Sequence, residues 1–279
     1  MKDLNRVDEL IKAVENSIDH PRKVTKGEEL FVGVDLGTAY IVIVVLDKDQ
    51  KPVACEMEFA QVVRDGLVVD FIGATNIVRK LKKKIEQKLN VELTKAAIAV
   101  PPGTGERDIK THTYVVEGAG MEVVSVDDEP TAANAVLKVE NGVVVDVGGG
   151  TTGLSIFKDG KVIYTADEAT GGTQLSLVVA GAYKIPFEEA EEKKKDPKNQ
   201  DEIFNVVTPV IQKIASIVKN HIEKFDVDNI YLVGGTCCLK GFEKVIKKET
   251  GIETIKPINP FLVTPLGIAI NCTNKNMNE

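Results

Sequence analysis

The chain has 279 residues, a length that fits one large domain or two of ordinary size. Its 42 acidic residues outnumber its 35 basic ones, and its five Tyr are not interleaved with basic clusters, which argues against a nucleic-acid-binding surface. No apolar run approaches the roughly 18 residues that a membrane span requires, and the N-terminus lacks the apolar core of a signal peptide. We therefore expect a cytoplasmic protein without nucleic-acid or membrane partners.

The first predicted element is an amphipathic helix within residues 1–28, which also include a polar linker. Leu4, Val7, Ile11, Val14 and Ile18 recur at helical spacing and would form one apolar face. Two interpretations remain open. The helix packs on its own domain, or it serves as an encapsulation helix of the kind that it resembles in proteins of bacterial microcompartments.

Two stretches of the chain are loosely repeated, "FVGVDLGTAYIVIVVLDKDQKPV" (31–53) and "GVVVDVGGGTTGLSIFKDGKVI" (142–163). Each contains an apolar strand, an Asp, a glycine turn with a Thr, a second strand and a polar turn, which is typical of a β-meander. Asp35 and Asp146 occupy the same place, 146 − 35 = 111 residues apart. The repeat predicts a duplicated α/β domain whose halves offer the same turn to a shared cleft.

The residues of these turns indicate a site for phosphate. Glycines leave backbone N–H groups unblocked, and such groups can form an anion-binding nest. An Asp beside each nest suggests a divalent cation, held through water, that neutralises the phosphate; Mg²⁺ is the natural candidate. One such hairpin alone is better interpreted as an ordinary turn, whereas two copies favour the phosphate site.

Between the repeats, the pattern predicts helices at residues 71–90 and 106–119 and strands at 96–103 and 122–130, an alternation that favours a largely parallel inner sheet. "EPTAANAVLK" then begins a helix with Pro130 in its first turn. Glu129 would lie where a strand ends and this helix starts. It either faces the cleft or caps the helix.

After the second repeat, Gly171 and Gly172 precede a predicted helix, and "FEEAEEKKKDPKNQDE" is interpreted as a solvated helix and loop. "IYLVGGTCCLKG" again ends an apolar strand in a glycine pair, Gly234 and Gly235, which would let a flat or phosphorylated group approach the backbone. "TPLGIAIN" is typical of a closely packed interior helix.

Taken in order, "DLGTAY", "DEPTAANA", "DVGGGTT", "LVGGTCC" and "TPLGIA" resemble the motifs of the actin, heat-shock-70 and sugar-kinase ATPase superfamily. The resemblance covers residues 31–271 and implies an α/β fold: a duplicated, ribonuclease-H-like, two-lobed structure that closes on Mg-ATP in a central nucleotide cleft. It also implies a division of the chain into an N-terminal helix and linker (1–28), lobe I (29–142, completed by 263–272), lobe II (143–262) and a tail (273–279).

The same resemblance implies roles for individual residues. Asp35 and Asp146 would hold the hydrated Mg²⁺ and orient the attacking water, with Glu129 near that water. The nucleotide would contact two groups of residues: Gly37, Thr38, Gly148, Gly149, Gly150 and Thr151 at the phosphates, and Gly171, Gly172, Gly234 and Gly235 at phosphate, ribose and adenine. The catalytic lysine of heat-shock-70 proteins has no counterpart that can be placed in this sequence.

Four short phrases, "VVRDG", "PPGT", "ADEATGG" and "VTPLGIA", are similar to those of bacterial ethanolamine-utilisation proteins. This resemblance implies an ATP-binding, weakly ATP-hydrolysing, chaperone-like protein that acts on ethanolamine ammonia-lyase or on microcompartment proteins, in the cytoplasm or associated with the microcompartment. The missing lysine favours an alternative, a nucleotide-gated scaffold or filament-forming actin-like protein with little hydrolysis. A small-molecule kinase is disfavoured, because no additional acid is placed to deprotonate an acceptor hydroxyl.

Overall fold

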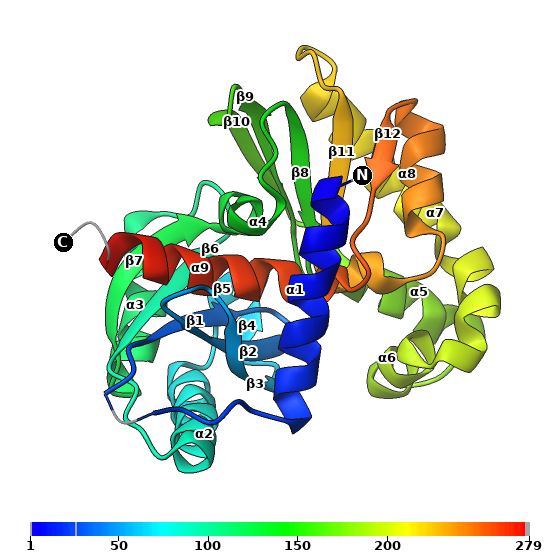
Figure 1. Ribbon diagram of the computed structural model, residues 1–279. Helices are drawn as coiled ribbons and strands as arrows, with labels where there is room; N and C mark the ends of the chain where they lie inside the picture. The colour runs from blue at the N-terminus through cyan, green and yellow to red at the C-terminus, as the bar shows by residue number, and fades with distance from the viewer. Residues whose placement is uncertain (1, 26, 277–279) are drawn as a thin grey trace.

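The computed structural model describes residues 2–25 and 27–276, which form two lobes, each around a five-stranded sheet (Figure 1). The first sheet contains β1 (Leu30–Leu36), β2 (Tyr40–Asp47), β3 (Pro52–Phe59), β6 (Lys95–Val100) and β7 (Glu122–Asp128). The second contains β8 (Gly142–Val147), β9 (Thr152–Lys158), β10 (Lys161–Glu168), β11 (Asn229–Val233) and β12 (Glu253–Ile255). A short hairpin, β4 (Val63–Arg64) and β5 (Leu67–Val68), lies outside both sheets.

The two sheets have the same topology. The strand order is β3-β2-β1-β6-β7 in the first and β10-β9-β8-β11-β12 in the second. In each sheet the first three strands form an antiparallel meander, and the remaining pairs are parallel. Asp35 pairs with Val42 and Asp146 with Gly153, near the carboxyl ends of the corresponding strands β1 and β8. The predicted duplicated, two-lobed α/β fold is confirmed.

Helices cover the sheets and connect the lobes. In chain order they are α1 (Lys2–Asp19), α2 (Phe71–Leu89), α3 (Glu106–Gly118), α4 (Glu129–Leu137), α5 (Gly172–Tyr183), α6 (Phe187–Lys195), α7 (Gln200–Ile222), α8 (Phe242–Thr250) and α9 (Val263–Asn276), with 3-10 turns η1 (Pro197–Asn199), η2 (Gly235–Cys238) and η3 (Pro260–Leu262). No helix in residues 2–25 and 27–276 combines the length and the apolar character needed to cross a bilayer.

Helix α2 shows how the sequence defines these elements. Asp70 caps its N-terminus by accepting a hydrogen bond from Gly73 N, and Asn90 ends it in the left-handed conformation. The apolar residues Leu81, Ile85 and Leu89 recur every four positions and are buried, so one face of the helix packs on the first sheet.

The lobes meet at two connecting helices. Helix α4 leads from β7 into β8, and α9 returns from the second lobe to pack on β1. The two helices approach closely at Gly267, where a Cβ atom would overlap the carbonyl oxygen of Ala132. Helix α9 continues to Asn276, beyond the predicted end at residue 272, and residues 277–279 of the predicted tail lie outside the described residues.

Helix α1 packs against the rest of the molecule. Val7, Ile11 and Val14 are buried in a core that also contains residues of both sheets. Glu15 Oε1 accepts a 2.6 Å hydrogen bond from Asn259 Nδ2, in the segment that precedes η3. Of the two interpretations that the sequence left open, the structure therefore shows a helix packed on its own domain.

Candidate functional site

A cavity of about 870 Å³ lies between the two lobes and collects residues that are far apart in the sequence. The predicted site residues that line it are Asp35, Gly37, Thr38, Glu129, Asp146, Gly148, Gly149, Gly150, Thr151, Gly172, Gly234 and Gly235. Gly171 does not line the cavity but packs directly behind it, since a Cβ atom there would lie 2.6 Å from the carbonyl oxygen of Gly148. The volume is in the range typical of small-molecule and cofactor sites.

The two glycine turns lie close to each other, and both line this cavity. A Cβ atom at Gly150 would lie 2.9 Å from Thr38 Oγ1 and 2.9 Å from the backbone nitrogen of Asp65. The turn after β8 therefore approaches both the turn after β1 and the tip of the β4–β5 hairpin. A side chain at Gly150 would occupy the space between the lobes.

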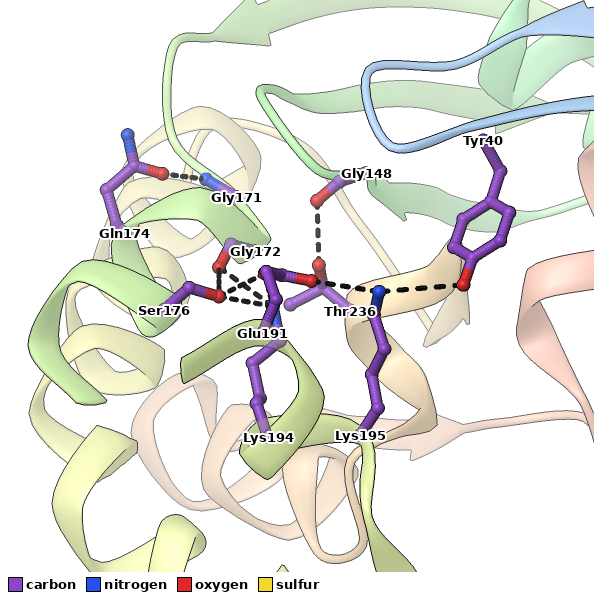
Figure 2. Close-up of polar contacts among 10 residues, drawn as sticks. All are labelled: Tyr40, Gly148, Gly171, Gly172, Gln174, Ser176, Glu191, Lys194, Lys195 and Thr236. Carbon is purple, nitrogen blue, oxygen red and sulfur yellow. Dashed lines mark hydrogen bonds and ion pairs between the residues drawn. The ribbon is translucent and has the colours of Figure 1, made fainter. Parts of the chain in front are cut away.

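In the turn after β8, the carbonyl groups of Gly148 and Gly149 accept hydrogen bonds from other parts of the protein. Gly148 O accepts hydrogen bonds from Gly172 N at 2.9 Å and from Thr236 Oγ1 at 2.7 Å, the latter drawn in Figure 2. Gly149 O accepts from Thr173 N at 2.8 Å. Because the start of α5 satisfies these carbonyl groups, the turn suits an anion, which needs N–H groups rather than carbonyl oxygens nearby.

Three carboxyl groups gather at the same place: Asp35 at the end of β1, Asp146 at the end of β8 and Glu129 at the start of α4. Burial, and then the charge of Asp146, raise the pKa of Asp35 to about 7. Burial raises the pKa of Asp146 to about 6, while a hydrogen bond from Thr264 opposes the shift. Burial, followed by repulsion from Asp146 and Asp35, raises the pKa of Glu129 well above its ordinary value.

These shifts show that the three carboxylates repel one another in a poorly solvated space, which a cation would relieve. The described residues contain no group of three or more His, Cys, Asp or Glu side chains arranged to hold a metal ion directly. The oxygen atoms of Asp35, Asp146 and Glu129 are the kind of ligand that a hard cation such as Mg²⁺ prefers, and Mg²⁺ usually keeps several of its waters.

The structure separates the two interpretations that the sequence left open for Glu129. Asp128 is the residue that caps α4, because its Oδ1 accepts a 2.9 Å hydrogen bond from Thr131 N. Asp128 Oδ1 also accepts from Ser155 Oγ of β9 at 3.0 Å. Glu129 is half-buried and lines the cavity.

The interpretation of the charge run in α6 as a solvated segment was wrong for three of its residues. Glu191 is 7% exposed, and its carboxylate contacts Ser176 Oγ, Lys194 Nζ and Lys195 Nζ (Figure 2). Glu191, Lys194 and Lys195 all line the cavity. Burial lowers the pKa of Lys194 despite the attraction of Glu191. Burial is also the largest single effect on the pKa of Lys195, but the charge and hydrogen bond of Glu191, with contributions from Tyr40, together raise it.

Two further residues near the carboxyl groups were missed. Thr264, at the start of α9, donates a 2.6 Å hydrogen bond to Asp146 Oδ2. Asp167, near the end of β10, has its pKa raised to about 6 by burial, an effect that a hydrogen bond from Thr151 opposes and that Asp146 reinforces. Thr264 lies in "TPLGIA", which resembles a superfamily motif, and Asp167 lies in "ADEATGG", which is similar to ethanolamine-utilisation proteins. The contacts of both residues are long-range, and no local pattern marks them.

Comparison with known proteins identifies the family. The family model of type IV pilus assembly protein PilM matches residues 104–277. Ethanolamine utilization protein EutJ of Salmonella typhimurium is 46% identical over 241 residues, which are 86% of this chain and 85% of that protein.

Solved structures agree. The crystal structure of ethanolamine utilization protein EutJ from Carboxydothermus hydrogenoformans has a TM-score of 0.91 and 48% identity, covering 96% of this chain and 99% of that one. MreB 5 of Spiroplasma citri bound to AMPPNP has a TM-score of 0.72 at 18% identity, covering 90% of this chain and 98% of that one, a likeness of fold that confirms the predicted actin-like architecture. The chain therefore belongs to the family of ethanolamine utilization protein EutJ and, through residues 104–277, to the wider family that the PilM model describes.

Proposed function

We propose that the chain binds ATP together with Mg²⁺ in the cavity between its lobes and hydrolyses it slowly. The observation that carries this proposal is the convergence of two glycine turns and three carboxyl groups, from both halves of the duplication, on one cavity of about 870 Å³. The turns supply N–H groups for a polyphosphate, and the carboxyl groups supply oxygen atoms for a hydrated cation.

The residues of this chain would divide the work as follows. Asp35 and Asp146 would hold the hydrated cation, which would supply positive charge at the phosphates when bound. Thr264 keeps Asp146 oriented and favours its ionised form, since the hydroxyl donates to the carboxylate. Glu129 lines the cavity beside both aspartates, and it would accept a proton from, or orient, a water molecule.

The remaining predicted residues would surround the nucleotide. The turn at Gly148 to Thr151, with Gly37 and Thr38, would hold the phosphates, and Gly172, Gly234 and Gly235 would approach the nucleoside. Gly171 contributes by letting the start of α5 pack against Gly148 and Gly149. Glu191 and Lys194 form an ion pair at the wall of the cavity, and neither residue was assigned to the site from the sequence.

Isothermal titration with Mg-ATP and a phosphate-release assay test the proposal, with wild type, Asp146→Asn and the exposed control Asp49→Asn compared side by side. We expect Mg²⁺-dependent binding by wild type and the control, and a loss of about 10²-fold or more in phosphate release for Asp146→Asn, as for removal of a positioned acid or base. Absence of Mg-ATP binding to the wild-type protein would contradict the proposal.

We further propose that the nucleotide state serves ethanolamine utilisation, through assembly, protection or reactivation of ethanolamine ammonia-lyase or of microcompartment components. Membership of the EutJ family supports this assignment. Co-purification from cells grown on ethanolamine, with ATP or ADP in the buffer, would identify the partner. ATP-dependent sedimentation without phosphate release would instead favour a nucleotide-gated scaffold.

A further inference from the structure

Lys195 joins the two lobes across the cavity. It is the last residue of α6 in the second lobe, yet its Nζ lies 4.5 Å from the ring centroid of Phe59 and 5.1 Å from that of Tyr40. The same Nζ lies 3.5 Å from the Tyr40 hydroxyl, a contact drawn in Figure 2. Tyr40 begins β2 and Phe59 ends β3, so both rings belong to the first lobe.

On its own side, the ammonium group of Lys195 is held by a buried carboxylate. Glu191 Oε2 lies 3.1 Å from Lys195 Nζ, while Oε1 of the same carboxylate contacts Lys194 at 2.5 Å and Ser176 of α5. Figure 2 shows Glu191 between the two lysines, facing the start of α5. These contacts fix the ammonium group of Lys195 relative to α5 and α6, although its side chain is long.

On the other side, the rings form a fixed receiving surface, which we call the aromatic cluster (Tyr40, Phe59 and Phe261). Tyr40 packs edge-on against Phe59 at a centroid distance of 5.5 Å and against Phe261 at 5.4 Å. Phe261 lies in η3, the segment that leads into α9. All three rings and Lys195 line the cavity, so the contact adjoins the space that the ligand would fill.

A second lysine of α6 provides a natural comparison. Lys193 Nζ lies 4.5 Å from the ring centroid of Tyr183, which ends α5 in the same lobe. The two lysines thus make similar cation–π contacts from the same helix, but the Lys195 contact crosses between the lobes and the Lys193 contact does not. Loss of Lys193 removes one charge and one ring contact, and loss of Lys195 removes one charge and two ring contacts. A change in lobe position is expected from Lys195 alone.

We propose that Lys195 is a positioning residue that holds the lobes closed against the aromatic cluster and slows release of the ligand. The lobes are joined where α4 and α9 pack together at Gly267, and the Lys195 contact joins them again at the wall formed by α6. For ligand release, this proposal rests on the proposed nucleotide function; for lobe position, it stands without a ligand. Phe59 is 44% exposed, so each ring contact alone is modest, but the two ring contacts together are strong enough to change a rate by about 10-fold.

The first experiment measures lobe position without nucleotide. Spin labels are attached at two exposed positions, Lys83→Cys in α2 and Lys248→Cys in α8, in a Cys238→Ser background. Double electron–electron resonance then measures the distance between the lobes. Lys195→Met should shift the distance distribution to longer distances and broaden it. Lys195→Arg keeps the charge and can stack on the rings, so it should give the wild-type distribution. Lys193→Met should match wild type.

The second experiment measures release of a fluorescent ATP analogue with Mg²⁺ by stopped flow. We expect about 10-fold faster dissociation for Lys195→Met, with association changed less than about 2-fold, and no further increase when Phe59→Leu is added, because both changes remove the same contact. A wild-type distance distribution for Lys195→Met, or an equal effect of Lys193→Met, overturns the proposal. If the wild-type protein binds no nucleotide, the proposed function fails, and the distance measurement still decides the role of Lys195.

Discussion

The hydroxyl of Thr264, the second residue of α9, donates a 2.6 Å hydrogen bond to Asp146 Oδ2 at the end of β8. The two residues are 118 positions apart, and their contact ties the helix that returns to the first lobe to the central carboxylate of the second. Because the hydrogen bond favours the ionised carboxylate, it limits the rise in the pKa of Asp146 that burial causes.

Replacement of Thr264 by Val should therefore weaken Mg-ATP binding in a pH-dependent way. A hydrogen bond to a charged group contributes about 1.5–3 kcal/mol, so its loss raises the pKa of Asp146 further, by one unit or more. Binding measured by calorimetry should be about 2- to 10-fold weaker at pH 7, and the deficit should shrink at pH 9, where the carboxylate is ionised again. Thr264→Ser keeps the hydroxyl and should behave as wild type; an equal deficit at both pH values would contradict this explanation.

Asp35 should make the metal-free, nucleotide-free protein less stable at alkaline pH. Its folded pKa is raised from 3.8 to about 7, so the folded state holds a proton that the unfolded state releases, and the free energy of unfolding falls as the pH rises from about 4 through 7. Full burial would make the loss about 4 kcal/mol, and since the side chain is half-buried we expect about 2 kcal/mol.

Asp35→Asn removes this titration and should raise the melting temperature at pH 8, with a much smaller effect at pH 4.5. Differential scanning calorimetry in a chelating buffer measures both. The exposed variant Asp49→Asn serves as the control for loss of one charge. A stabilisation that is the same at the two pH values would show that repulsion among the carboxylates is not its source.

Two glycines in helices should respond to alanine in opposite directions. At Gly267 a Cβ atom would overlap the carbonyl oxygen of Ala132, where α4 and α9 pack together, so Gly267→Ala should cost about 1–3 kcal/mol in the free energy of unfolding. At Gly181 in α5, no atom of the described residues beyond its two chain neighbours and the adjoining helix backbone lies within 4 Å of the Cβ position. Gly181→Ala should therefore stabilise by about 0.5–1 kcal/mol through helix propensity. Urea unfolding distinguishes the two, and a neutral Gly267→Ala would refute the close approach of the connecting helices.

Because α1 packs on the rest of the protein, truncation of its buried side chains should lower the free energy of unfolding. The same truncation in a helix that does not pack on the protein would not. Ile11 is fully buried among residues of both sheets, so Ile11→Ala should lower the free energy of unfolding by about 2–5 kcal/mol. The exposed neighbour Lys12→Ala should change it by less than about 0.5 kcal/mol. Equal unfolding curves for the two variants would indicate that the helix leaves the surface in solution.

The features that could be predicted from the sequence are those that depend on short, contiguous patterns of residues. Both meanders were predicted from the apolar runs that end in Asp35 and Asp146 and from the glycine turns that follow. Helix α2 was predicted from the four-residue spacing of Leu81, Ile85 and Leu89. The repeat also predicted that the two turns share a cavity, because duplicated halves present corresponding turns to a common cleft.

What the sequence did not reveal depends on contacts between distant segments. Glu191 and Lys195 belong to a charge run whose composition is typical of a solvated helix, and only the packing of α6 on α5 turns them into the cavity. The contact of Thr264 with Asp146 requires α9 to cross between the lobes. Asp128 and Glu129 are adjacent acids, and the backbone geometry at the start of α4 decides which one caps the helix.

The proposed function requires that Asp35 and Asp146 act together on one hydrated cation at one nucleotide. A double-mutant cycle with Asp35→Asn, Asp146→Asn and the double variant, measured by calorimetric titration of Mg-ATP, tests it directly. We predict that each single change weakens Mg²⁺-dependent binding strongly and that the double variant is little worse than either. Additive losses, or binding of Mg-ATP that neither substitution alters, would contradict the account.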